Sequence, residues 1–186
     1  MSEHPGVSDA GADADADALL RSLGAAEIAH PGGTLLAHLH RVAGLLAGWG
    51  ARPELRSAGL CHACYGTDGF AVPLLPLDRR AELAAVIGQA AEDIVFTYAG
   101  CERAATYRAL TADPPAFHDR FTGRSFRPTP AQQRDFAELT AANELDLVRQ
   151  DPVFRERHGP GLLALFTRWG PLLSGPARRT VTELLG

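Results

Sequence analysis

The sequence predicts an all-α fold, and three observations support that prediction. Apolar residues recur at spacings of three and four along most of the chain, as with Val42, Leu45 and Leu46, which is the period of a helix with one buried face. No segment shows the alternation typical of a strand. Glycine and proline stand where helices would stop and start. The 186 residues, 46% of them hydrophobic, suit one domain with a sizeable core.

The first half of the chain divides into short helices separated by glycine and proline. Residues 1–11 are rich in Gly, Ser, Pro and acids, so we expect them to be disordered, with one helical domain over 12–186. The aspartates that follow Ala12 suit the positive end of a helix dipole, and Thr34 is a candidate N-cap. The helices expected here are 12–23, 34–48, 53–65 and one broken at Gly88 into 78–86 and 89–98.

The second half contains the clearest helix start. Thr129 is followed by Pro130, which places an N-cap residue before a proline at the first helical position. Residues 111–128 are rich in proline, glycine and charged residues, so we expect them to form a long loop over the surface. The helices expected here are 102–110, 129–150, 160–173 and 176–185, which makes a bundle of about eight helices in all.

Composition and charge argue against several functional classes. The net charge of −4 and the pI of about 5.9 argue against nucleic acid as a partner, because non-specific binding needs a basic face. All 18 basic residues are arginine, so the chain can form no lysine Schiff base and no lysine-dependent phosphate loop. We expect no membrane partner, since no run of about 18 apolar residues is present. Three cysteines and no visible signal peptide favour a cytoplasmic location.

Two histidines are the strongest candidates for chemistry. His38 lies in phase with Leu35 and Val42, so it faces the buried side of its helix. His62 ends the next helix beside a glycine turn, where helices open onto clefts. Imidazole is the commonest side-chain metal ligand, and two such rings on consecutive helices could converge on one ion. The alternative is that each is a neutral, hydrogen-bonded core residue.

These motifs resemble the HD-domain superfamily. His38 lies four residues before Val42, and about twenty residues later an apolar run precedes His62. The closest likeness is to the hydrolase domain of the RelA/SpoT family, whose later motifs are similar to residues 80–95 and 142–146. The resemblance covers about residues 30–150, within a divergent actinobacterial branch that lacks the aspartate of the His-Asp pair. It implies an HD-like helical bundle, a divalent ion (manganese, zinc or iron) and a small-molecule phosphate-ester substrate.

Two acids of the superfamily pattern are replaced in this chain. Ala63 stands in place of the aspartate after His62, and Asn143 aligns with the final metal-binding aspartate. Asp146 is the best substitute, because residues three apart share a helix face. We therefore expect His38, His62 and Asp146 to hold the ion.

Other residues could complete the chemistry. Asp68, in the loop after His62, and Glu92 are the acids expected to handle the proton, and Arg103 is expected to meet the phosphate. His30 and His40 could complete the ligand set.

Three functions are compatible with these residues. The first is a metal-dependent phosphohydrolase of the HD type, acting on a nucleotide or another phosphate ester. The second is a non-catalytic helical module that binds a small ligand or a protein. The third is an HD-type iron oxygenase. The sequence leaves the substrate, the metal and the oligomeric state open.

Overall fold

The computed structural model describes residues 9–186, and this part is predominantly helical, which confirms the predicted all-α class. None of its helices is long and apolar enough to span a bilayer. Its α-helices are α1 (Asp9–Ser22), α2 (Leu35–Gly48), α3 (Pro53–Cys61), α4 (Arg80–Ile87), α5 (Gln89–Ala99), α6 (Arg103–Ala109), α7 (Pro130–Gln150), α8 (Pro152–Arg168) and α9 (Gly175–Leu185). Two antiparallel pairs of short strands are β1 (Ala29–His30) with β2 (Gly33–Thr34), and β3 (Phe117–Asp119) with β4 (Arg124–Phe126).

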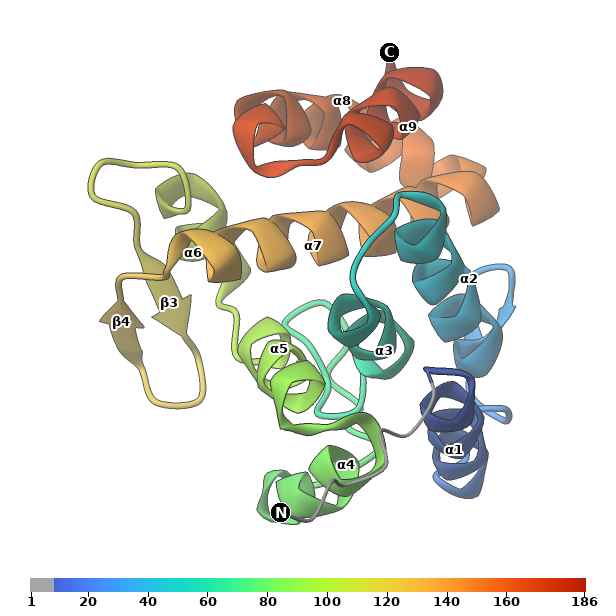
Figure 1. Ribbon diagram of the computed structural model, residues 1–186. Coiled ribbons are helices and arrows are strands. Elements are labelled where there is room, and N and C mark those ends of the chain that lie inside the picture. Colours follow the sequence, from blue (N-terminus) through green and yellow to red (C-terminus); the bar gives the residue numbers. More distant parts are fainter. Residues whose placement is uncertain (1–8) are drawn as a thin grey trace.

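Helix α7 runs through the middle of the molecule (Figure 1). Helices α8 and α9 pack on one side of it, and α2, α3 and α5 pack on the other. Helices α1 and α4 lie farther from α7, against α3 and α5. Because α2, α3 and α7 meet, residues far apart in the sequence can line one site at their junction.

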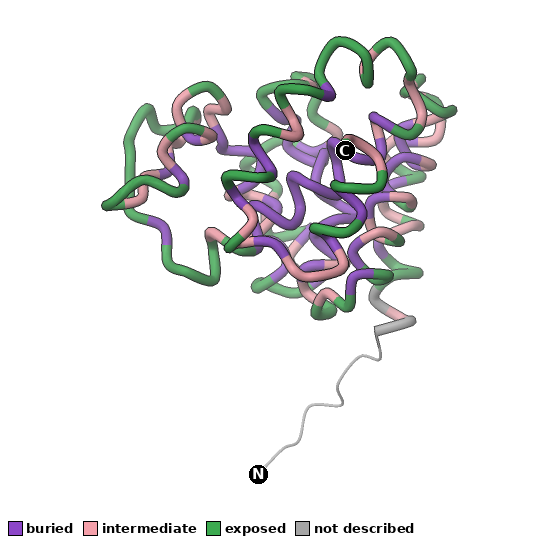
Figure 2. Tube along the Cα trace, turned by 90° about the horizontal axis from the view of Figure 1, so that it is seen from above, coloured by how far each residue is buried: buried purple, intermediate pink, exposed green. Residues whose placement is uncertain are grey.

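Two clusters of buried apolar side chains form the interior. One surrounds α7 and includes Phe136 and Trp169, and the other lies among α1 to α5 and includes Leu20 and Leu83. Helix α2 belongs to both, with Leu46 in the first cluster and Leu39 in the second. Figure 2 shows the buried stretches gathered inside a rim of exposed chain.

The helix starts expected at Thr34 and Thr129 are confirmed. The Thr34 hydroxyl accepts a hydrogen bond from the Ala37 amide at 3.2 Å. Thr129 and Gln132 form a capping box ahead of Pro130. Each cap satisfies amide groups that would otherwise lack an intrahelical partner.

Three expectations about individual elements were wrong. Helix α8 begins at Pro152, not near residue 160, because Asp151 accepts from two amides of the first turn and the helix continues through Pro160. Helix α3 ends at Cys61, so His62 caps it. Strands of two or three residues lie in segments read as loops, including the long loop at 111–128. Most of the segment 1–11 lies outside the described residues, and α1 begins at Asp9.

The contact between α2 and α3 depends on a glycine. An alanine Cβ at Gly59 would overlap Cδ1 of the fully buried Leu46, whereas a Cβ at Gly44 on α2 would meet no atom within 4 Å. We expect Gly59→Ala to lower the free energy of unfolding by about 1–3 kcal/mol through overpacking. Gly44→Ala, the matched control, should raise it by up to about 1 kcal/mol through helix propensity. Urea unfolding followed by circular dichroism measures both, and equal stabilisation by the two variants would contradict the packing argument.

Candidate functional site

The site is built around the buried carboxylate of Asp146 on α7. His38 Nδ1 on α2 lies 2.6 Å from Asp146 Oδ2, and both side chains are 2% exposed. Arg41, on the next turn of α2, donates from Nε to Oδ1 at 2.7 Å and from Nη2 to Oδ2 at 3.0 Å. Burial works to raise the pKa of Asp146, but the hydrogen bonds from His38 and Arg41 outweigh it and lower the pKa overall. Asp146 is therefore an ionised carboxylate that fixes the His38 ring.

The second nitrogen of His38 is also engaged. Its Nε2 lies 3.0 Å from Asn143 Oδ1, and Asn143 Nδ2 in turn donates to Glu144 Oε1 at 3.2 Å. Both ring nitrogens of His38 are therefore engaged with oxygen atoms. In this arrangement neither nitrogen is open to a further partner.

His62 has the opposite character. Its Nδ1 donates to the Gly59 carbonyl at 2.7 Å, which leaves Nε2 unprotonated in the neutral ring. Burial first, and then the neighbouring His38, lower the pKa of His62 to about 3. The ring centroids of His62 and His38 are 5.3 Å apart, with the rings edge to face. His62 therefore places a hydrogen-bond acceptor beside His38.

A third imidazole completes the cluster. His30, at the end of β1, stacks on His38 with ring centroids 4.2 Å apart. Burial, and then His38, lower its pKa to about 4, so this ring is also neutral near pH 7. The β1–β2 turn places it there, because Gly32 and Gly33 take positive φ values and turn the chain back toward α2.

These side chains line a cavity of about 300 Å³, which we call the histidine cavity. Its walls come from α2, α6, α7, the β1 segment and the loop after α3. Its polar lining consists of His30, His38, His62, Thr67, Arg103, Asn143 and Glu144.

Arg103 forms one wall of this cavity. Its guanidinium Nη1 lies 3.1 Å from Glu144 Oε1. Gly69 leaves room for it, since a Cβ there would lie 2.8 Å from Nη1. Burial works to lower the pKa of Arg103, but Tyr107, Tyr98 and Glu144 outweigh it, so the guanidinium stays charged.

The two acids predicted for proton transfer lie elsewhere. Asp68 Oδ2 accepts from the Arg103 backbone amide at 2.9 Å, so its role is to hold the start of α6. The buried Glu92 carboxylate accepts from Arg80 Nε and Nη2, each at 2.6 Å, and from the Tyr65 hydroxyl at 2.8 Å. Neither carboxylate lines the histidine cavity. His40 lies on the opposite face of α2, half exposed, where it contacts Asp17.

Sequence reasoning missed the roles of Arg41 and Glu144. Arg41 lies three residues after His38, so the helical period put both on the face that meets Asp146. Glu144 follows Asn143 directly, but its pairing with Arg103 depends on how α6 meets α7 and has no local sequence signal.

The predicted ion ligands come together without forming a metal centre. Within the described residues, no group of three or more His, Cys, Asp or Glu side chains is placed to hold a metal ion. Both oxygens of Asp146 are held by Arg41 and one also by His38, while both nitrogens of His38 are engaged. The donor set as it stands does not fit a divalent ion.

Comparison with known proteins gives one match. Residues 19–103 match the family model described as a domain of unknown function, DUF6817. Searches of curated proteins and of solved structures found no match. The matched segment contains His38, His62 and Arg103, whereas Asn143, Glu144 and Asp146 lie beyond it. These comparisons give no link to the HD superfamily, so that resemblance stays a prediction.

The low pKa of His62 has a consequence for stability. In the unfolded chain this group titrates near 6.5, and in the folded chain near 3. The contribution of neutral His62 to the free energy of unfolding is fully present above pH 6.5. It is lost as the pH falls toward 3, because between these pH values only the unfolded state takes up the proton. Between pH 6 and 4, we expect His62→Gln to reduce the slope of unfolding free energy against pH by about 1.4 kcal/mol per pH unit.

Urea unfolding at several pH values measures this slope. His158→Gln, a change at an exposed histidine on α8, is the matched control and should leave the slope unchanged. An identical slope in wild type and His62→Gln would show that His62 is not held neutral by the fold.

Proposed function

We propose that this protein binds a small anionic ligand of the phosphate-ester class in the histidine cavity. The observation that supports this best is the Arg103 guanidinium, which lines the cavity beside three histidine rings and is 28% exposed. A charged guanidinium beside a cavity is a ready partner for a phosphate group, which its planar fork can bind through two parallel hydrogen bonds. Glu144 supplies the counter-charge until a ligand arrives.

The remaining polar groups complement such a ligand. Arg103 supplies N–H donors at the cavity wall, and His62 presents an unprotonated Nε2 as an acceptor. A phosphate monoester has a second pKa near about 6, so at neutral pH a minor share carries one hydroxyl among acceptor oxygens, and this share grows as the pH falls. A site with both a donor and an acceptor suits that mixture.

The same groups favour binding over hydrolysis. An efficient general base has a pKa near the working pH, and the pKa of His62 is about 3. Both nitrogens of His38 are engaged by hydrogen bonds, and the carboxylates of Asp68 and Glu92 lie outside the cavity. The non-catalytic module is therefore the stronger of the functions that the sequence allowed.

Arg103→Gln tests the proposal with inorganic phosphate as the probe. We expect wild-type protein to bind phosphate measurably by calorimetry, and the variant to bind it about ten- to a hundredfold more weakly, because a hydrogen bond to a charged group contributes about 1.5–3 kcal/mol. Arg108→Gln, at an exposed arginine on the same helix, is the matched control and should bind like wild type.

Because Arg103→Gln leaves the buried Glu144 unpaired, the double variant Arg103→Gln with Glu144→Gln is needed as well. The double variant removes both charges. We expect it to remain folded but to bind phosphate only weakly. Equal phosphate affinity in wild type, this double variant and Arg108→Gln would overturn the proposal.

The metal-dependent HD phosphohydrolase is the second candidate. The convergence of His30, His38 and His62 on one cavity favours it. The donor set does not fit an ion unless Arg41 releases Asp146, and breaking that buried pair is strongly unfavourable. The iron oxygenase depends on the same donors and meets the same objection.

Metal content distinguishes these candidates. After incubation with manganese, zinc or ferrous iron and gel filtration, we expect plasma mass spectrometry to find well under about 0.1 equivalent of metal, because Asp146 and both nitrogens of His38 are already engaged by hydrogen bonds. Near-stoichiometric metal in wild type, lost in His62→Ala, would revive the phosphohydrolase and refute metal-free binding.

A further inference from the structure

A second cavity adjoins the histidine cavity. It has a volume of about 410 Å³ and lies between α6 and α8. Arg103, Glu144 and Phe154 line both cavities, so the Arg103–Glu144 ion pair stands at their common boundary. A group bound to the Arg103 guanidinium is therefore within reach of both.

The walls of this second cavity are mainly apolar. Tyr107, Leu162 and Leu165 form them with Phe154, whose ring lies 4.6 Å from that of His158. Arg168 also lines the cavity, but its Nη2 donates to the Tyr107 carbonyl at 2.9 Å. The one acid in the lining is Glu144, which is paired with Arg103.

We propose that the two cavities form one binding site for a phosphate monoester with an uncharged, apolar organic group. This inference rests on the proposed function. The phosphate occupies the histidine cavity against Arg103, and the organic group extends past Phe154 into the second cavity. The volumes suit this division, because sites for small molecules commonly measure about 300–1,000 Å³ and combine apolar walls with a few polar anchors.

Methyl phosphate and n-butyl phosphate are matched probes, because they carry the same charge and differ by three methylene groups. Each buried methylene adds about fourfold in affinity, so we expect wild type to bind butyl phosphate at least about tenfold more tightly than methyl phosphate. Calorimetric titration measures this ratio of affinities.

Ala164→Trp places a large side chain at the second cavity. Ala164 is exposed and lines only that cavity, so the substitution overpacks no core. We expect the ratio to fall to about one while the affinity for methyl phosphate stays unchanged. Thr167→Trp, also exposed on α8 but away from the cavity, is the matched control and should keep the wild-type ratio.

The outcomes separate the two proposals. If wild type binds butyl phosphate and methyl phosphate with nearly equal affinity, and methyl phosphate still binds through Arg103, the extended site is refuted and the proposed function stands. A high ratio that survives Ala164→Trp would likewise show that the organic group lies elsewhere. Absence of methyl phosphate binding would refute the proposed function and this inference together.

Discussion

The carboxylate of Asp146 is the interaction on which the site depends. A buried charge of this kind is tolerated only when opposite charge and hydrogen bonds offset its lost hydration. Arg41 and His38 provide both, and because they lie one turn apart on α2, they fix how α2 meets α7. That contact also orients the His38 ring against which His30 stacks and His62 packs. The arrangement of the histidine cavity thus depends on the hydrogen bonds made by the Asp146 carboxylate.

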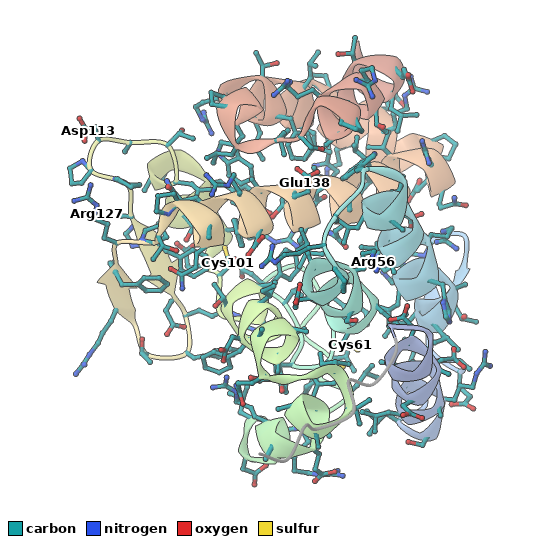
Figure 3. All side chains as sticks on the ribbon, viewed as in Figure 1. Arg56, Cys61, Cys101, Asp113, Arg127 and Glu138 are labelled. Carbon is teal, nitrogen blue, oxygen red and sulfur yellow. The ribbon has the colours of Figure 1, made fainter. Side chains whose placement is uncertain are left out.

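Asp146 is one of four acids by which α7 is connected to its surroundings. Each acid meets a donor from a different part of the fold. These four buried carboxylates of the central helix therefore all have hydrogen-bond partners. The four contacts are Asp135 with Arg52, Glu138 with Ser174, Glu144 with Arg103, and Asp146 with Arg41. Glu138 lies along α7 in Figure 3, where it faces the start of α9. Buried, satisfied polar contacts of this kind specify one arrangement, because any shift along α7 would leave several charges unpaired.

The sequence was informative wherever the structure follows from local rules. The helical period placed His38 on the buried side of its helix and Asp146 on one face with Asn143, and Thr129 with Pro130 marked the start of α7. Prediction failed where the outcome depends on distant partners: Glu92 was expected to handle the proton, but the turn at Gly88 brings Arg80 against it. Strands of two or three residues are too short to show alternation, so both hairpins were missed. The start of α8 was misplaced because Pro160 resembles a first-turn proline, although Asp151 had already begun the helix.

Each of the two acids beside the histidines is paired with an arginine. A buried carboxylate needs such a cation to offset its charge. The guanidinium of Arg41 neutralises Asp146, and that of Arg103 neutralises Glu144. The two cations differ in what holds them: Arg41 makes two hydrogen bonds to Asp146 and further ones to the carbonyls of Pro31 and Gly32, whereas Arg103 meets its carboxylate through one nitrogen at 3.1 Å. An incoming anion would therefore compete more easily for Arg103 than for Arg41, which is why we propose the binding site on that side of the histidines.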